Sequence, residues 1–453
     1  MIHKVSILPF VIHIRNKMWK NEIRESLPLS LLLINSVVWF SVSWFVIEDL
    51  IKEAPFNNVL LVSSSYFGAL LLSAVIGATL LSKKLRGKRP LLSWVLLGAV
   101  ACVLSAVLAP ERNSINLVFV SLPLGALAGL GIPTCLALFS KVSRSMNRGR
   151  YGGIAFFLIQ AFTVLIFMPV SSANMDYQFL VLAAWRLVGV LCVFFWMPHE
   201  GVAEERQIRL LGIIRERTFF LYFVPWFLFA IVNFVEQPLL EHYFGVDLYN
   251  LYMMAGILIT SVSALLGGAL CDFKGRKVSG VLGFILLGIG YAFLTLLEGT
   301  QVSQILWTLF VGVAWGLLYV TFVLVVWGDI SEGRTREKYY LLGGMPFLLS
   351  NLISVLVKPF VEIIPITASF SLASFFLFLA ILPMLYAPET LSEKVLKKRE
   401  LKNYIEKAQK EATKAMRNEE EENKQCENEN DDWEIDVNQE DSEKATELAE
   451  KYY

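Results

Sequence analysis

The chain has 453 residues, 55% of them hydrophobic, and carries no net charge because 40 Lys and Arg balance 40 Asp and Glu. A soluble domain of this length would alternate charge with apolar residues, whereas here charge is absent from long stretches. This distribution excludes a soluble globular enzyme. It also argues against a nucleic-acid-binding protein, since there is no basic surface domain, and it indicates a membrane protein.

Twelve apolar stretches are each long enough to cross a bilayer, which takes about 20 residues of helix. Lipid cannot satisfy backbone N–H and C=O groups, and barrel strands would be half as long, so we predict an all-α transmembrane protein. Arg186 interrupts the sixth stretch. The predicted spans are 27–47, 57–81, 91–109, 116–140, 152–174, 177–197, 218–239, 249–270, 278–297, 303–328, 339–361 and 366–387.

Positive charge is distributed unevenly between the two sides of the predicted spans. If the N-terminus is cytoplasmic, the inner segments hold 24 Lys and Arg, and the outer segments hold only Lys52, Arg112 and Lys358. Cytoplasmic loops carry such an excess of cations. We therefore expect a multi-pass protein of the cell membrane with its N- and C-termini in the cytoplasm.

The flanking and connecting segments are charged. The first segment contains a short apolar run but no small-residue cleavage site, so we interpret it as a leader and not a signal peptide. We expect the connector to form a surface helix along the membrane. The distal tail, residues 418–453, holds fifteen Asp and Glu against three Lys and is expected to be disordered, with no partner identified. The predicted organisation is a cytoplasmic leader (1–26), a first six-helix bundle (27–197), a cytoplasmic connector (198–217), a second bundle (218–390) and a cytoplasmic tail (391–453).

Sequence landmarks of the first half recur in the second half, in the same order, 187 to 191 positions later. Many solute carriers are built from such repeats, with a binding site between the halves. We therefore predict twelve membrane-spanning helices in two pseudo-symmetric six-helix bundles. The matching landmarks are Leu85–Arg89 with Phe273–Lys277, Gly125–Gly129 with Gly312–Gly316, Gly152–Gly153 with Gly343–Gly344, and Pro198–Glu200 with Pro388–Thr390.

The loop between spans eight and nine reads Gly-Ala-Leu-Cys-Asp-Phe-Lys-Gly-Arg-Lys. It resembles, position for position, the signature G-x-L-x-D-x-x-G-R-K of the major facilitator superfamily (MFS). The resemblance implies a cytoplasmic gate in which Asp272 meets the N-terminus of span five near Gly152, where a negative charge is favourable. A charged turn that only fixes topology is the alternative. The second-half gate residues are Gly268, Asp272, Gly275, Arg276 and Lys277.

The first-half copy of the signature is degenerate. Gly87, Lys88 and Arg89 match its end, but the acid position holds Lys84 and the opening glycine position holds Leu80. The first gate contact of the family is therefore in doubt in this chain.

Two proline–glutamate segments end spans six and twelve. Pro198-His199-Glu200 and Pro388-Glu389-Thr390 resemble the endings found there in sugar-porter-like members of the family. Proline stops a helix and leaves the acid at the water boundary. This feature does not decide between a sugar, metabolite or drug transporter.

Uncharged polar side chains within the spans are candidates for substrate binding, because each is costly in hydrocarbon. Gln160 and Asn351 lie 191 positions apart, at mid-depth of spans five and eleven, and Asn35 and Asn233 lie in spans one and seven. A cavity shared by the two halves would collect such groups. Interhelical hydrogen bonds are the alternative.

Charged side chains within the spans are candidates for coupling. Arg186 needs a carboxylate, backbone carbonyls or a wet cavity, although a Trp-Arg pair is a structural feature of span six in relatives. Glu48 and Glu236 lie 188 positions apart near the outer ends of spans one and seven. A desolvated carboxylate can carry a proton, whereas one at the interface stays ionised. Lys358 and Glu362 are interpreted as a helix end in preference to an outer gate pair.

No enzymatic or cofactor motif is found in the sequence. The four histidines cluster nowhere, the five cysteines lack metal spacing, and no phosphate-binding loop is present. We therefore predict no enzyme activity, no cofactor and no metal. The expected function is secondary active transport of a small organic solute by alternating access, with the lipid bilayer and a co-transported proton or ion as further partners. The alternative is a non-transporting sensor or scaffold that acts through its cytoplasmic tail.

Overall fold

The computed structural model describes residues 7–111, 113–143, 145–195 and 206–391, and in the tail residues 397, 401, 404–405 and 407–413; side chains are described from residue 26 onward, except that of Ser350. These residues form helices and no strand, which confirms the all-α prediction; Arg206 and Arg334 form an isolated bridge. Met1–Leu391 is one compact unit and Ser392–Tyr453 a second. Residues 407–413 of the second unit are helical, and the predicted disorder of 418–453 falls outside the described residues.

The described residues contain twelve helical segments long and apolar enough to cross a membrane, as the sequence predicts. Short helices α3 (Ser82–Leu85), η1 (Ala109–Glu111), α8 (Leu210–Ile214) and η3 (Lys358–Phe360) lie between or beside them. The spans are α1 (Ile7–Ile51), α2 (Phe56–Thr79), α4 (Lys88–Leu108), α5 (Ser114–Val142), α6 (Arg148–Ser171), α7 (Met175–Phe195), α9 (Arg217–Phe244), α10 (Val246–Phe273), α11 (Arg276–Leu296), α12–η2–α13 (Gln301–Leu318, Tyr319–Val325, Val326–Ile330), α14–α15 (Arg336–Leu348, Ser350–Val357) and α16–α17 (Ile366–Leu379, Ile381–Tyr386).

The tenth and eleventh spans are irregular along their length. The eleventh is interrupted at Leu349, between α14 and α15. In the tenth, Tyr319–Val325 forms a π-helical segment, a geometry that often marks functional sites. Both irregularities lie on helices that contact the other half.

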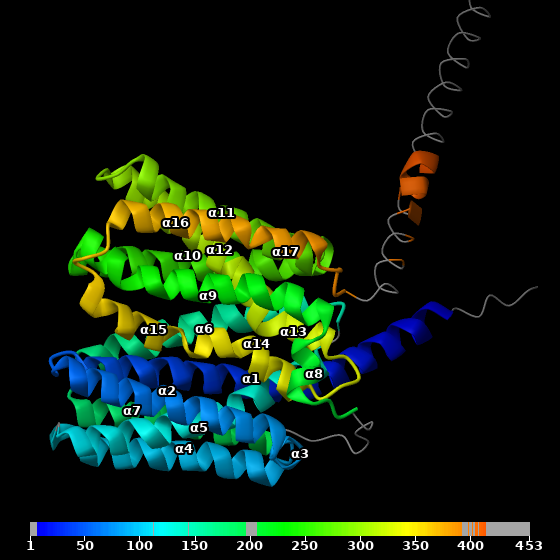
Figure 1. Cartoon of the computed structure of the whole chain (residues 1–453). Coiled ribbons are helices and arrows are strands. Elements are labelled where there is room, and N and C mark those ends of the chain that lie inside the picture. Colours follow the sequence, from blue (N-terminus) through cyan, green and yellow to red (C-terminus); the bar gives the residue numbers. More distant parts are fainter. Residues whose placement is uncertain are drawn as a thin grey trace, which may run out of the picture. The chain divides into compact units, whose positions relative to one another are not determined.

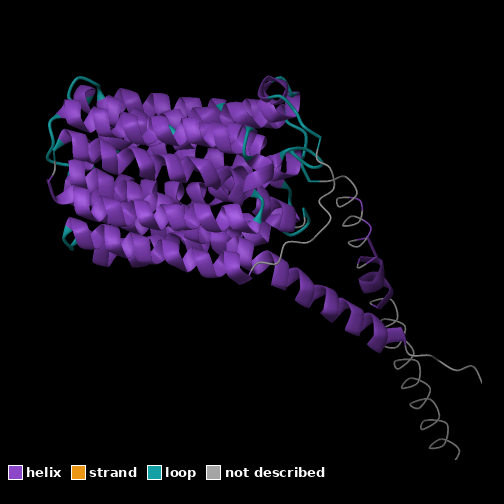
Figure 2. Cartoon of the chain, turned by 90° about the horizontal axis from the view of Figure 1, so that it is seen from below, coloured by secondary structure: helices purple, strands orange, loops and turns teal. Residues whose placement is uncertain are grey.

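The first unit contains two groups of helices, one from each half of the chain. The helix contacts within one group correspond to those within the other. Helix α2 packs on α5 and α4 on α7 in the first half, while α10 packs on α12 and α11 on α16 in the second. Across the halves, α6 packs against α10, and α14 and α15 pack against α2. Figure 1 shows α6, α14 and α15 between the two groups, and Figure 2 shows the helices side by side. Since α2 and α10 are second in their halves and α6 and α14 fifth, the two cross-contacts are equivalent.

The described part of the connector between the halves, residues 206–217, is only partly helical. It is extended over 206–209 and then forms the five-residue α8, in place of the predicted surface helix. The N–H of Arg206 donates to the Gly333 carbonyl at 3.2 Å, and Arg334 forms an ion pair with Glu216. The hydrogen bond with the Tyr339 hydroxyl, together with the Glu216 carboxylate, raises the pKa of Arg334. The connector is therefore fastened to the loop before α14.

Glycines allow close packing within each half. A Cβ added at Gly129 of α5 would lie 1.9 Å from the Leu70 carbonyl oxygen of α2, and one at Gly316 of α12 would lie 2.7 Å from the Thr260 oxygen of α10. Lipid supplies little hydrophobic drive between helices, so close backbone approach is what stabilises these pairs.

We predict that Gly129→Ala lowers the melting temperature of the purified protein, because the new methyl forces α5 away from α2, at a cost of about 1–3 kcal/mol. Gly68→Ala on α2 is the matched control, since a Cβ there meets nothing within 4 Å. It should be neutral or stabilising, because Ala favours a helix over Gly. Equal melting temperatures for the two variants would contradict this account of the α2–α5 contact.

Candidate functional site

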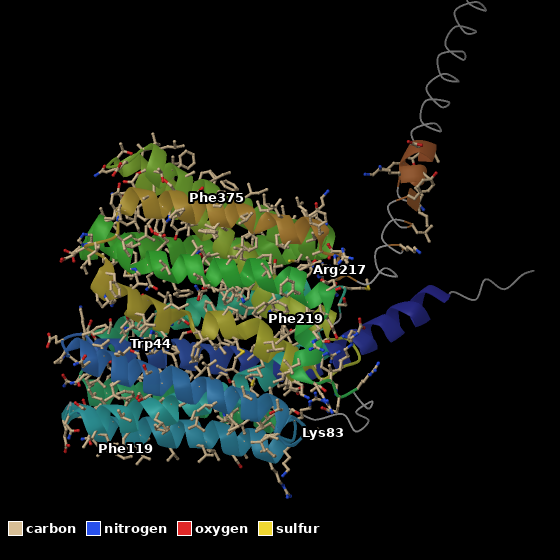
Figure 3. All side chains as sticks on the ribbon, viewed as in Figure 1. Trp44, Lys83, Phe119, Arg217, Phe219 and Phe375 are labelled. Atoms are coloured by element: carbon tan, nitrogen blue, oxygen red, sulfur yellow. The ribbon has the colours of Figure 1, made fainter. Side chains whose placement is uncertain are left out.

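The loops rich in Lys and Arg gather at one end of the first unit, the end that the charge distribution predicts to be cytoplasmic; we term it the basic end. Figure 3 shows Lys83 and Arg217 at this end, and Phe119 at the opposite one. Helices α6, α9 and α14 all begin at the basic end, with Arg148, Arg217 and Arg336.

Asp272 connects the two halves at the basic end. Its fully buried carboxylate accepts hydrogen bonds from the N–H groups of Gly149 and Arg150, both at 2.9 Å. The N–H groups of a first helical turn have no intrahelical partner, so the acid caps α6 of the other half. The contact lies one turn before Gly152, the position indicated by the sequence. A Cβ at Gly149 would lie 2.4 Å from the Gly268 carbonyl oxygen, so the close approach requires glycine.

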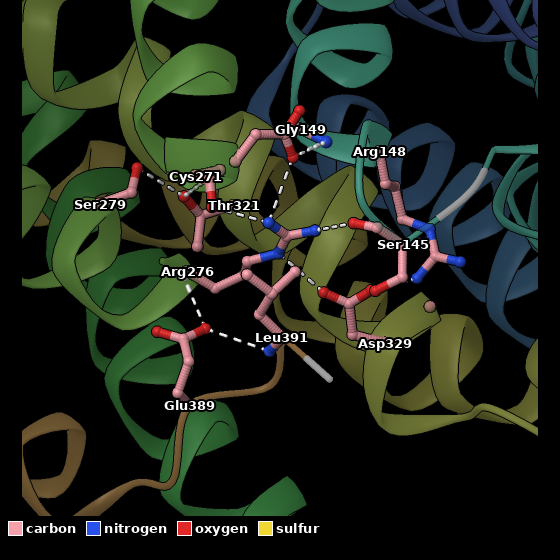
Figure 4. Close-up of polar contacts among 12 residues, drawn as sticks. Ser145, Arg148, Gly149, Cys271, Arg276, Ser279, Thr321, Asp329, Glu389 and Leu391 are labelled. Carbon is pink, nitrogen blue, oxygen red and sulfur yellow. Dashed lines mark hydrogen bonds and ion pairs between the residues drawn. The ribbon is translucent and has the colours of Figure 1, made fainter. Parts of the chain in front are cut away.

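Arg276 joins Asp272 to a second acid, Asp329, at the end of α13 (Figure 4). Its Nε donates to Asp329 Oδ2 at 2.9 Å, and one of its terminal nitrogens lies 3.2 Å from Asp272 Oδ1. Arg148 of the first half also forms an ion pair with Asp329. These residues are almost fully buried. Asp329 is not among the residues predicted from the sequence, although an acid directly after a predicted span is a signal for such a partner.

The ending Pro388–Thr390 caps α11. Glu389 accepts from the N–H of Arg276 at 2.9 Å and from that of Lys277 at 3.2 Å. Gly275 has φ +110°, and a Cβ there would lie 2.3 Å from a Glu389 oxygen, so only glycine fits. The matching segment Pro198–Glu200 lies outside the described residues.

The lysines of the two signature copies have similar roles. Lys277 Nζ donates to the Leu385 carbonyl at 2.6 Å, and Lys88 Nζ donates to the Phe194 carbonyl at 2.7 Å. Each cation therefore meets the carboxyl end of the last helix in its half, where positive charge is favourable. Gly87 precedes the first residue of α4, and Arg89 is exposed.

Three of the candidate amides share one environment. Gln160, Asn233 and Asn351 are half-buried, and none forms a hydrogen bond to the described residues. Each follows a phenylalanine of its own span by four positions: Phe156, Phe229 and Phe347. Residues four apart lie on one face of a helix, although the break at Leu349 intervenes in the third case.

These phenylalanines belong to an aromatic cluster around Tyr319 and Trp315. The Tyr319 ring centroid lies 4.9 Å from that of Phe156, 5.2 Å from Phe347 and 4.6 Å from Trp315, and Trp315 lies 5.2 Å from Phe229. Because α6, α9 and α14 all begin at the basic end, each amide lies one turn farther from that end than the cluster. The amides and the cluster together involve both halves at mid-depth.

Asn35 and Arg186 bind each other and lie apart from the other candidates. Asn35 Nδ2 donates to the Trp185 carbonyl at 2.6 Å, and its Oδ1 accepts from Arg186 at 3.2 Å. The fully buried guanidinium lies over Trp39, 4.6 Å from the ring centroid, and over Trp94, at 4.1 Å. Two aromatic faces can stabilise a buried cation.

Glycines pack tightly around this pair. A Cβ at Gly98 would lie 2.8 Å from Arg186 Nε, and one at Gly189 would lie 2.5 Å from Asn35 Oδ1. The geometry favours a structural role, in which Arg186 holds α1, α4 and α7 together.

The two acids near the opposite end differ. Glu236 is 3% exposed; its Oε1 accepts from the Ser369 hydroxyl at 2.6 Å, and its Oε2 has no partner among the described residues. Glu48 lies 4.0 Å from Lys358, and both side chains are largely exposed. This pair crosses the halves, so Lys358 does not simply end a helix.

The comparisons with known proteins agree with this architecture. The family model of the Major Facilitator Superfamily matches residues 29–327, more than half of the chain. The chain therefore belongs to this superfamily and is a multi-pass membrane transporter, as the signature loop indicates. No curated protein sequence matches it significantly.

Solved transporter structures share the fold. The MFS proton:xylose symporter XylE, bound to 6-bromo-6-deoxy-D-glucose, is 14% identical with a TM-score of 0.62, over 81% of this chain and 96% of that one. The human organic anion transporter MFSD10 is 14% identical with a TM-score of 0.59, over 80% of this chain and 99% of that one. At these identities the likeness shows the fold alone.

We predict that Arg186→Leu lowers the free energy of unfolding by at least about 2 kcal/mol, because it removes two ring contacts and two buried hydrogen bonds. Arg89→Leu, at an exposed position, is the control and should stay near wild type. Thermal unfolding of the detergent-purified proteins measures both. Equal melting temperatures would exclude the structural role.

Proposed function

We propose that the protein is a secondary active transporter that moves a polar but uncharged small organic solute by alternating access between its two halves. The observation that carries this proposal is a set of three half-buried amides, Gln160, Asn233 and Asn351. They have no hydrogen-bond partner among the described residues, and each follows by four positions a phenylalanine of the aromatic cluster. Amides hydrogen-bond hydroxyl, carbonyl and amine groups, and aromatic faces stack on a ring. None of these side chains would neutralise a charged solute.

The contacts between the halves support the mechanism. At the basic end the halves are held by buried acids that pair with arginines and cap a helix, among them Asp272 and Asp329. At the opposite end, Glu48 and Lys358 form an ion pair whose side chains are 44% and 47% exposed, so it contributes little. A solute would thus approach the amides from the opposite end in this conformation. Separation of the Asp272 contacts would then open the basic end.

We predict that a solute which stabilises the purified protein in a thermal-shift screen loses this effect after Gln160→Ala or Asn351→Ala, because the amides hydrogen-bond it. Gln304→Ala is the control, because the Gln304 amide already accepts a hydrogen bond from Tyr252 of the neighbouring helix α10. This variant should show the full thermal shift with the solute. Uptake into proteoliposomes would establish transport of the same solute. A shift that survives both site substitutions would contradict the assignment.

We propose that a proton is co-transported and that Glu236 carries it. An ionised carboxylate at 3% exposure without a cation is costly, and no Lys, Arg or His of the described residues forms an ion pair with it. We therefore infer that burial favours the protonated form of Glu236 in this conformation. Its Ser369 partner lies on α16, so a shift of α16 relative to α9 would change the environment of the proton.

We predict that Glu236→Gln abolishes solute accumulation driven by a pH gradient in proteoliposomes while solute exchange persists, because glutamine mimics the protonated acid permanently. Glu48→Gln, at the exposed equivalent, should keep gradient-driven accumulation. The coupling role of Glu236 is contradicted if the Glu236→Gln variant accumulates solute at the wild-type level. It is also contradicted if accumulation by the wild-type protein does not depend on the pH gradient.

A further inference from the structure

We propose that this chain has replaced the missing first gate contact with one of reversed charge, in which the cation is on the loop and the acid is on the helix start. The loop residue is Arg86, between α3 and α4, and the acid is Glu337 in the first turn of α14. The role of this contact in gating rests on the proposed alternating access, but its existence as a closing element can be tested without a solute.

The pair has the geometry of a strong interaction. Arg86 Nε and one terminal nitrogen each lie 2.6 Å from a different carboxylate oxygen of Glu337. The Glu337 side chain is fully buried and that of Arg86 is 16% exposed. A bidentate guanidinium–carboxylate pair away from water is among the strongest polar contacts in proteins. It joins the loop after α2 to α14 of the other half.

The reversal of charge is found at several pairs of equivalent positions in the two halves. At an offset of 188, the acid Asp272 corresponds to Lys84 and the acid Asp329 to Lys141, while Gly149 corresponds to Glu337. Helices α6 and α14 begin at this offset, at Arg148 and Arg336, although the glycine pairs Gly152–Gly153 and Gly343–Gly344 farther along them are 191 positions apart. Both acids of the second gate contact are thus lysines in the first half, and the glycine of the helix start is an acid.

The two arrangements exclude each other sterically and electrostatically. In the second contact, a Cβ at Gly149 would lie 2.6 Å from Asp272 Oδ1, so any side chain there would displace the capping acid. In the first contact the helix start already carries a carboxylate, and an acid at position 84 would add like charge nearby. A Glu in the first turn is itself favoured by the helix dipole, but when buried it needs a cation, which Arg86 supplies.

The two gate contacts therefore separate differently. In the second, Asp272 is bound to backbone N–H groups, so α6 must move away for the contact to break. In the first, both groups are side chains and can part by rotation. The small buried residues Ala74 and Ala78 of α2 pack against Leu341 of α14 in the same interface. Arg86 and Glu337 are thus the charged contribution to closure at α2–α14.

The proposal is tested by reversing the pair in the full-length protein. Spin labels at Lys83→Cys and Glu332→Cys, both exposed and on opposite halves of the basic end, report the separation of the halves after Cys192 and Cys426 are replaced by Ser. Arg86→Glu or Glu337→Arg alone should shift the distance distribution to longer values, with the ratio of closed to open populations falling at least about tenfold. The double variant with both substitutions should restore the wild-type distribution.

A second double variant removes both charges together, so that neither partner is left as an unpaired buried charge. Arg86→Gln with Glu337→Gln should fold and should also favour longer distances, even if the single reversals are unstable. Lys84→Asp, which restores the acid of the family signature, should lengthen the distances as well. The proposal is overturned if the reversed pair behaves like the single variants, or if the double Gln variant keeps the wild-type distribution. Because no solute is involved, failure here would leave the proposed substrate site untouched.

Discussion

The structure depends on bringing two helical halves together where apolar burial offers little advantage over lipid. Helices in a bilayer associate through close packing and polar contacts, and both occur where α6 crosses α10. Gly149 and Gly268 bring the backbones together, and Asp272 then reaches N–H groups that have no partner within their own helix. Once that acid is buried it needs a cation, and Arg276 supplies it. Asp329 in turn binds the Arg276 guanidinium.

The same reasoning separates the polar residues within the spans into two kinds. Asn35 and Arg186 hydrogen-bond each other inside the first bundle. The Arg186 guanidinium also lies over two tryptophan rings, although its Nε and one terminal nitrogen have no hydrogen-bond partner among the described residues. Gln160, Asn233 and Asn351 form no hydrogen bond with the part of the chain that the structure describes, although an amide in hydrocarbon is costly. A polar group that the fold leaves unsatisfied at mid-depth is expected to meet water or a solute. The distinction therefore rests on hydrogen bonding and not on residue type.

The sequence was sufficient for the twelve spans because lipid requires length and the absence of charge, and both can be read along the chain. The signature loop likewise located Asp272, since it matches the family position for position. Contacts between distant helices could not be read in this way. Nothing in the sequence pairs Asn35 with Trp185, Arg86 with Glu337, or Glu48 with Lys358. The interruption at Leu349 could not be predicted either, because prolines within other spans leave the helix uninterrupted.

The internal repeat specifies where polar groups lie more strictly than what charge they carry. Glu48 and Glu236 occupy equivalent positions, yet one is an exposed member of an ion pair and the other a buried acid bonded to a hydroxyl. Lys84 stands where the other half has Asp272, and the start of α14 carries Glu337 at the position where α6 has Gly149. Complementarity across an interface constrains the two partners jointly, so both can change sign while the geometry of closure is retained. An asymmetric pair of contacts at the basic end is therefore compatible with two halves of the same fold.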